Sequence, residues 1–305
     1  MDRQDITLSL ILLANSRTTL RTIAQQLNIS VNAVHKRIRA LEGQKVIRKF
    51  TAKVSHFAAG NIPIQLYGHT GSEVSQETVK VLGNEEHTYW VALAGGNHLY
   101  IGAYLKDIGE LDRYVSFISQ NSGMSDPTVG IIGFVGQPMT PQPLAQPTLS
   151  DIDYRIIFSL RNDSRRPMTE VAQELGLSAK TVQKHLDRMV AEGSIELSIQ
   201  WYPDATDDIV SVFHIKTTTS EDKSKVAASL TNKYFPKVLF NFAFSNLPCE
   251  LMAMTWSNNM RDLKELRDTL QKEKGIQSIS TNILFTGYIF DTWRDDLVEA
   301  KAKQE

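Results

Sequence analysis

One segment of the sequence occurs twice, at a fixed offset of 148 residues. Residues 20–47 (LRTIAQQLNISVNAVHKRIRALEGQKVI) align without a gap on residues 168–195 (MTEVAQELGLSAKTVQKHLDRMVAEGSI). Seven of the 28 aligned pairs are identical and five exchange one apolar residue for another, so the shared positions are mainly those that packed helices bury. The 305-residue chain is long enough for several domains. The repeat predicts two copies of one plan.

Each copy shows the same order of local signals. An apolar-periodic helix comes first and a short helix follows, at about 19–27 or 167–175, before a tight break. Ser30 or Ser178 then supplies an N-cap oxygen for a third helix, which is worth about 1 kcal/mol. A β-rich segment closes each unit. Helix, helix, turn, helix and strand is the order of a winged helix-turn-helix.

The segments after the winged units repeat as well. In 62–135 and again in 209–288 the pattern predicts a strand, a helix, two strands, a helix and a strand. This βαββαβ order is the ferredoxin-like plan, a four-stranded antiparallel sheet with two helices on one face. The fold class is therefore α+β, with two tandem copies of a winged helix-turn-helix followed by a ferredoxin-like domain. The expected domains are 1–56, 57–137, 150–204 and 205–305, the last ending in a helix over about 291–303, with a proline-rich linker at 138–149.

Charge is distributed unevenly along the chain. The formal net charge is −1, yet residues 1–56 hold ten Lys and Arg against three acidic residues, a net of +7. The remaining residues therefore sum to −8. Such asymmetry indicates that the first winged unit meets a polyanion.

Several function classes are disfavoured by composition. Cys249 is the only cysteine, so no disulfide framework is possible, and no Cys/His spacing resembles a zinc site. The apolar run near the N-terminus is too short to span a bilayer. The expectation is a cytoplasmic, non-enzymatic protein without a metal, a cofactor or a membrane partner.

Residues 149–195 (LSDIDYRIIFSLRNDSRRPMTEVAQELGLSAKTVQKHLDRMVAEGSI) are similar along their whole length to the winged helix-turn-helix of the Lrp/AsnC (feast/famine) transcription regulators. The βαββαβ units resemble the ligand-sensing domain of that family. Its usual member is a single copy that dimerises, whereas this chain fuses two copies. The resemblance implies a sequence-specific regulator of double-stranded DNA whose halves act as a pseudo-dimer, with further association into dimers of pseudo-dimers.

In a helix-turn-helix, the exposed face of the third helix enters the major groove. Arg and Lys donate to guanine, and Asn pairs with adenine. Cations on the following strand would neutralise phosphates, which positions the protein without reading sequence. The predicted DNA-binding residues of the first copy are Ser30, Asn32, His35, Lys36, Arg37, Arg39, Arg48, Lys49 and Lys53.

The second copy is electrostatically weaker. Asp187 occupies the place of Arg39, and the following β segment has Glu196 and no Lys or Arg. We therefore expect an asymmetric operator whose half-sites differ in sequence and strength. The predicted contacts of this copy are Arg165, Arg166, Lys180, Thr181, Gln183, Lys184, His185 and Arg188.

The resemblance also implies a small effector, such as an amino acid, near the turn between the two central strands of each sensor unit. Gly95 and Gly96 would allow close backbone approach, Asn97 would hydrogen-bond the ligand, and Asn246 lies in the equivalent loop. The Gly-x-x-Asp pattern common in these loops is absent from both copies. Ordinary hairpin turns are the alternative interpretation.

Two other functions remain open from the sequence. Sirohaem decarboxylases share this domain plan, and some are fused double copies. On that hypothesis Arg48, His56 and Tyr100 would contact a tetrapyrrole carboxylate. The other alternative is a regulatory partner that does not bind DNA, with the charged helix faces merely solvated.

Overall fold

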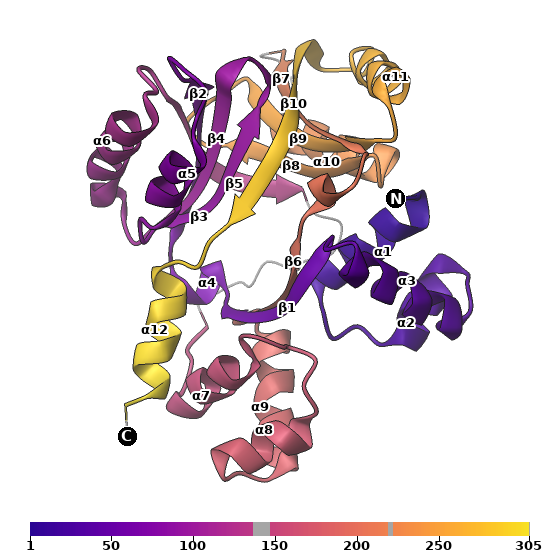
Figure 1. Cartoon of the computed structure of the whole chain (residues 1–305), viewed down its shortest axis with the longest axis vertical. Coiled ribbons are helices and arrows are strands. Elements are labelled where there is room, and N and C mark those ends of the chain that lie inside the picture. Colours follow the sequence, from indigo (N-terminus) through magenta and orange to yellow (C-terminus); the bar gives the residue numbers. More distant parts are fainter. Residues whose placement is uncertain (137–146, 219–221, 305) are drawn as a thin grey trace. The chain divides into compact units, whose positions relative to one another are not determined.

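The computed structural model describes residues 1–136, 147–218 and 222–304 (Figure 1). Most of the predicted linker therefore lies outside the described residues. The chain forms two compact units, and each unit takes segments from both copies. One unit contains residues 62–136 and 206–290, and the other contains residues 2–61, 147–205 and 291–304. We call them the barrel unit and the helix-turn-helix unit.

The helix-turn-helix unit confirms the predicted order in both copies. Residues in the left-handed conformation, Asn28 (φ 52°) and Gly176 (φ 67°), end each second helix and make the tight break. The first copy comprises α1 (Arg3–Ala14), α2 (Leu20–Leu27), α3 (Val31–Gly43), β1 (Ile47–Val54) and the short α4 (His56–Ala59). The second comprises α7 (Asp151–Leu160), α8 (Met168–Leu175), α9 (Ala179–Ala191) and β6 (Ile195–Trp201), and α12 (Trp293–Ala302) joins it.

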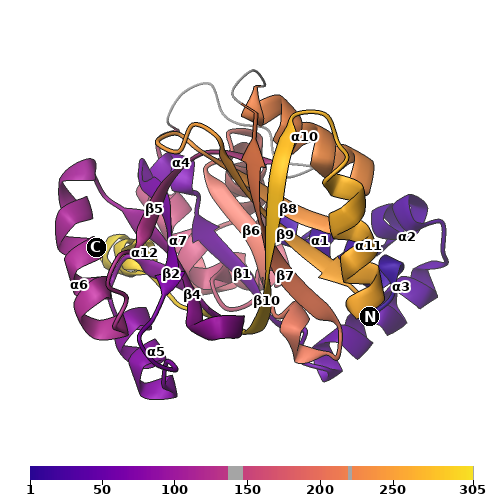
Figure 2. The ribbon, with the colours of Figure 1, turned by 90° about the horizontal axis from the view of Figure 1, so that it is seen from above.

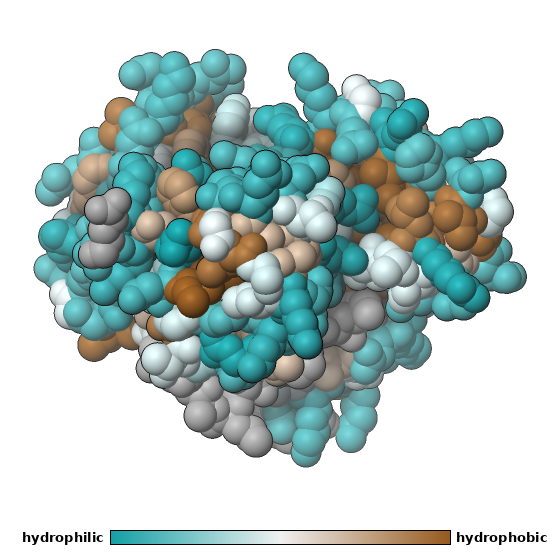
Figure 3. Space-filling view, turned by 90° about the horizontal axis from the view of Figure 1, so that it is seen from below, coloured by the Kyte–Doolittle hydropathy of each residue, from teal (hydrophilic) through white to brown (hydrophobic). Residues whose placement is uncertain are grey.

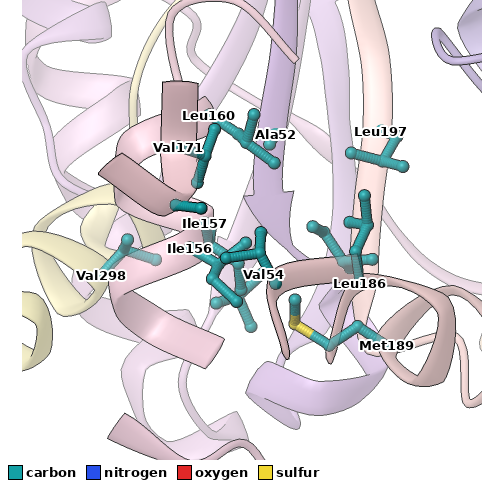
Figure 4. Close-up of a cluster of buried hydrophobic side chains, with 13 residues drawn as sticks. Ala52, Val54, Ile156, Ile157, Leu160, Val171, Leu186, Met189, Leu197 and Val298 are labelled. Carbon is teal, nitrogen blue, oxygen red and sulfur yellow. The ribbon is translucent and has the colours of Figure 1, made fainter. Parts of the chain in front are cut away.

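The β segments that close the two winged units lie in one shared ribbon. Strand β1 pairs with β6 of the other copy in one antiparallel two-stranded ribbon, with Ala52 opposite Leu197 and Val54 opposite Ile195. Figure 4 shows Ala52 and Val54 among side chains of α7 and α9. Both are about 1% exposed and belong to the hydrophobic core of the second copy. The first copy thus contributes part of its neighbour's core.

The barrel unit confirms the βαββαβ order twice, but its two sheets join into one closed barrel. Strand order around the barrel is β10-β3-β4-β2-β5-β8-β9-β7 (Figure 2). The first copy supplies β2 (Ile62–His69), α5 (Gln76–Gly83), β3 (Thr88–Ala94), β4 (His98–Leu105), α6 (Leu111–Ser122) and β5 (Thr128–Gly136). The second supplies β7 (Ile209–Thr217), α10 (Lys223–Tyr234), β8 (Val238–Phe244), β9 (Glu250–Ser257), α11 (Met260–Leu270) and β10 (Ile276–Ile289).

Two seams close this barrel. Strand β5 pairs with β8, and β10 pairs with β3, so the outer strand of each sheet completes the other sheet. Because unpaired strand edges invite association with other chains, mutual pairing satisfies both edges. Strand β10 begins at Ile276, earlier than the sequence pattern indicates, because its first half pairs with β7 and its second half with β3.

Alternation along the strands gives each sheet two apolar faces. One face packs against helices, as with Leu66 and Ile101 in the first copy and Phe213 in the second. The other face fills the barrel interior with Tyr67, Tyr100 and further large side chains. Within the described residues, no helix is long and apolar enough to cross a membrane.

The β5–β8 seam depends on a missing side chain at Gly130. A Cβ there would lie 2.3 Å from the ring of Phe244, which is 1% exposed and has no room to move. We expect Gly130→Ala to lower the free energy of unfolding by about 1–3 kcal/mol, the usual cost of overpacking. Gly71→Ala is the matched control, because a Cβ at Gly71 meets nothing within 4 Å. Equal denaturation midpoints for the two variants would contradict this account of the seam.

Candidate nucleic-acid interface

The third helices, α3 and α9, are built as predicted. The Ser30 hydroxyl accepts from the Ala33 N–H at 3.1 Å, and the Ser178 hydroxyl accepts from the Thr181 N–H at 3.0 Å. Three apolar residues of each helix face inward, namely Val34, Ile38 and Leu41 in α3 and Val182, Leu186 and Met189 in α9. The exposed polar positions are Asn32, His35, Lys36, Arg39 and Glu42 on α3, and Lys180, Gln183, Lys184 and Asp187 on α9.

Arg37 does not face solvent freely, contrary to the prediction. Its guanidinium donates to Asp5 at 2.6 Å and to Gln4 at 2.8 Å, and it lies 2.9 Å from Asp2. These partners are at the start of α1, so Arg37 fixes the third helix to the first. Its role in this structure is to hold the helices together.

His185 is the equivalent of Arg37 in the second copy and makes the equivalent contact. Its Nδ1 lies 2.8 Å from Asp153, which is the offset counterpart of Asp5, and Arg188 also donates to Asp153. Burial raises the pKa of Asp153, but hydrogen bonds from Ser150, His185 and Arg188 outweigh it and hold that pKa below its ordinary value. Both copies thus use an acidic residue of the first helix to anchor the third.

The β1 cations are engaged within the unit as well. The Arg48 guanidinium lies 3.5 Å from the centroid of the Tyr202 ring, and Lys53 forms ion pairs of 2.9 Å with Asp291 and Asp295. Lys49 is half-buried. These cations lie on a paired strand, so the predicted cationic wing is not a free projection.

The Arg165 side chain reaches the first copy, whereas the Arg166 side chain is held within the second. Arg165 donates to the Ser16 carbonyl at 2.7 Å and lies over the Phe50 ring, whereas Arg166 donates to Ser159 and pairs with Glu174 at 2.7 Å. Their predicted role as accessible phosphate contacts is not supported by this geometry.

A reciprocal contact that the sequence analysis missed joins the copies. The hydroxyls of Ser16 and Ser164, exactly one repeat offset apart, lie 2.6 Å from each other, and both side chains are fully buried. Arg17 donates to the Ser164 carbonyl at 2.6 Å, as its counterpart Arg165 does to Ser16. The Ser-Arg pair at 16–17 recurs at 164–165, at the same offset of 148 but just before the aligned segments. Extending the alignment towards the N-terminus would have shown that these two residues are repeated.

Four predicted cations remain exposed and have neither an ion pair nor a stacked aromatic ring among the described residues. They are Lys36 and Arg39 on α3, and Lys180 and Lys184 on α9. Helix α9 also exposes Asp187, whose carboxylate accepts from the Gln183 side chain at 2.7 Å. Thr181 on the same helix is half-buried, and its hydroxyl lies 2.8 Å from that of Ser178. Figure 3, which views the molecule from the side where Figure 1 draws α8 and α9, shows a mainly hydrophilic surface with apolar patches.

The predicted effector loops differ from each other. Gly96 (φ 68°) and Asn97 (φ 56°) form a tight turn, and the Asn97 carbonyl accepts from the Thr70 N–H at 3.0 Å. Asn246 is not free to bind a ligand, because its side chain accepts from the Ile131 N–H at 2.8 Å and donates to the Val129 carbonyl at 2.7 Å.

A hollow of about 370 Å³ opens beside the second loop. Lys216 and Glu250 place opposite charges on its wall, and the other lining residues are Leu247, Pro248, Cys249 and Gln277. The Glu250 carboxylate also accepts from the Tyr67 hydroxyl at 2.9 Å. No group of three or more metal-ligating side chains occurs in the described part of the chain.

Comparison with known proteins matches the winged helix-turn-helix DNA-binding family at residues 1–48 and again at 149–196. The chain carries two winged helix-turn-helix domains of this family. An uncharacterized HTH-type transcriptional regulator of Pyrococcus horikoshii is 24% identical over 43% of this chain and 90% of its own length. Another, from Pyrococcus furiosus, is 29% identical over 45% of this chain and 91% of its own length. Each relative thus corresponds in length to about half of this chain.

Among solved structures, the siroheme decarboxylase NirDL covers 97% of this chain and 99% of its own, with a TM-score of 0.58 and 14% identity. At that identity the likeness shows the fold alone. AsnC of E. coli covers 48% of this chain with a TM-score of 0.41 and 18% identity. The predicted fold class and the double-copy form, with two winged helix-turn-helix domains in one chain, are confirmed.

The Asp153 anchor gives a pH-dependent prediction. Because its folded-state pKa is lowered, its contribution to stability is present above the unfolded-state pKa of about 3.9 and is lost as pH falls through the folded value. Asp153→Asn is therefore expected to lower the free energy of unfolding by about 1–3 kcal/mol at pH 7 and by much less near pH 2. The measurement is urea unfolding at both pH values. Asp151→Asn, an exposed acid on the same helix, is the control and should change stability little.

Proposed function

We propose that the protein is a sequence-specific regulator that binds double-stranded DNA, with the two halves of one chain acting as a pseudo-dimer. The observation that carries this proposal is the pair of capped helices, α3 and α9, each with exposed cations that no described residue neutralises. Internal packing accounts for Arg37, Arg48 and Lys53 but gives no reason for Lys36 and Arg39. A polyanion supplies that reason.

In this mechanism α3 and α9 enter successive stretches of the major groove. Asn32 pairs with adenine on its Hoogsteen edge, while Lys36 and Arg39 donate to guanine or to flanking phosphates. The first turn of each helix directs backbone N–H groups towards phosphate, which the helix dipole favours. The β1–β6 ribbon and the Ser16–Ser164 contact join the two heads within one compact unit.

The two half-sites of the operator differ in this proposal. At equivalent positions α3 has Asn32 and Arg39, whereas α9 has Lys180 and Asp187. Asp187 repels phosphate, so the second head binds more weakly. The regulator therefore has a fixed orientation on an asymmetric site.

Arg39→Ala tests the interface. Arg39 is exposed and forms no ion pair with a described residue, so the variant is expected to keep its thermal stability and to bind DNA more weakly. If Arg39 contacts phosphate, the slope of log affinity against log salt decreases by about 0.9. Fluorescence anisotropy with fragments from random-sequence selection, across a salt series, measures both quantities.

The control for this experiment is Lys80→Ala, which removes an exposed cation from the barrel unit, where Lys80 lies 3.6 Å from Glu77. Its DNA affinity should equal that of the parent protein. An equal loss of affinity in both variants would mean that net charge, and not the α3 face, determines binding.

Spacing between the half-sites is a second test of the pseudo-dimer. Because the ribbon and the serine contact couple the heads, we expect little tolerance of altered spacing. Inserting 5 base pairs at the operator centre rotates one half-site by about half a helical turn and should lower affinity at least tenfold. Footprinting of the natural and expanded sites measures it. Equal protection of both would show that the heads bind independently.

The effector belongs to the same proposal, at the hollow beside the second loop. Lys216 and Glu250 suit the carboxylate and the ammonium of a free amino acid, so the expected effector is zwitterionic. Isothermal titration with the twenty amino acids tests this. Heat of binding that persists unchanged in Lys216→Ala would exclude the site.

The likeness to NirDL supports a second candidate, a sirohaem decarboxylase. Of the residues predicted for that activity, Tyr100 is fully buried in the barrel interior, where its hydroxyl lies 2.6 Å from His214 Nε2 and accepts from Asn282 at 2.6 Å. The Tyr100 hydroxyl is thus already hydrogen-bonded and is not accessible to a tetrapyrrole carboxylate, which favours the regulator over the decarboxylase. Addition of sirohaem, followed by its absorption spectrum and by carbon dioxide release, discriminates the two functions.

A further inference from the structure

Val31 is an apolar residue in an unusual place. It is the first residue of α3, directly after the Ser30 cap, and its side chain is 44% exposed. Few large apolar side chains in the described residues are as exposed, and this one adjoins Asn32. On a helix, residues four apart share a face, so Val31 and His35 lie beside Asn32 and Lys36. The exposed α3 face therefore has an apolar corner at its N-terminal end.

Local folding does not account for this valine. A hydrophobic staple would pair the residue before the cap, Ile29, with Val34, and leaves Val31 outside. Valine is also a weaker helix former than alanine, which occupies the equivalent position as Ala179. An exposed β-branched residue at this position thus contributes little to stability.

In a duplex, the C5 methyl of thymine is the apolar group that the major groove presents to a recognition helix. The N-terminal residues of that helix are the ones that contact base edges. A valine methyl against a thymine methyl would remove both from water, and the neighbouring Asn32 would bond an adenine.

We propose that Val31 is a specificity-determining residue that recognises a thymine methyl in the first half-site. The inference rests on the proposed function and deepens it. The first half-site then contains a T·A pair where Val31 meets the groove. The equivalent residue of the second copy is Ala179, which lacks both γ-methyl groups of valine, so the second half-site has a weaker thymine preference. The two half-sites then differ in apolar as well as in charged contacts.

The test replaces each thymine of the selected operator, one at a time, by deoxyuridine, which keeps every hydrogen-bonding group and lacks the methyl. For the parent protein, one replacement in the first half-site is expected to weaken binding about three- to tenfold. Val31→Ala should bind the thymine operator more weakly and should bind the thymine and uracil forms equally. Fluorescence anisotropy measures all four affinities.

Two further variants sharpen this double-mutant design. Val190→Ala shortens an equally exposed valine near the end of α9, and it should leave the thymine effect intact. Ala179→Val should create a new thymine preference in the second half-site. Thermal unfolding of Val31→Ala should match the parent, because an exposed side chain is shortened.

The outcomes separate this inference from the proposed function. If no variant and no parent protein binds any selected DNA, the proposed function fails. If the parent binds but the uracil replacement weakens Val31→Ala as much as it weakens the parent, the assignment to Val31 is overturned while the regulator stands.

Discussion

The exchange of strand β1 is the interaction on which the helix-turn-helix unit depends. Each three-helix head lacks a closing β layer of its own, and the antiparallel pairing of β1 with β6 supplies one to both heads. Ala52 and Val54 of the first copy are buried in the core of the second, and the Ser16 N–H donates to the Leu197 carbonyl at 3.0 Å in the reciprocal direction. The shared ribbon therefore couples the two heads, and with them α3 and α9, through packing.

The barrel unit applies the same solution to its sheets. A four-stranded sheet with helices on one face leaves its other face and both edges open to water, which favours association. Here the open faces of the two copies enclose one interior, and the edges pair at two seams. Some polar groups are satisfied across the copies, as between Tyr67 and Glu250. Burial holds the pKa of His98 and of His214 at about 4, so both are neutral at physiological pH. The interior is thus uncharged at those positions and packed.

Local structure could be predicted from the sequence, whereas the particular strands and side chains that join the copies could not. Helix caps, apolar periodicity and the βαββαβ order depend on neighbours in the chain, and Ser30 and Ser178 cap their helices as expected. The fate of a cation depends on what the fold brings near it. Arg37 and Arg39 look alike in the sequence, yet α1 places carboxylates against Arg37 and leaves Arg39 exposed. The pairing of β1 with β6 could not be predicted either, because a strand that pairs with the other copy and a strand that forms a separate wing have the same sequence pattern.

Fusion of the copies permits differences that a homodimer excludes. In a homodimer a substitution appears in both heads, whereas here Arg48 has Glu196 as its counterpart. Glu196 accepts from the His56 N–H at 3.0 Å and lies 3.3 Å from Arg294, a residue of α12. Burial raises the pKa of Glu196, but Arg294 and His56 outweigh that effect and keep it below its ordinary value. In the described residues no helix equivalent to α12 follows the first copy, so only the second copy has an arginine that pairs with a carboxylate at this position. The same freedom allows the third helices to differ in charge at one equivalent position, where α3 has Arg39 and α9 has Asp187. Divergence at both places gives the chain a direction that a symmetric dimer lacks.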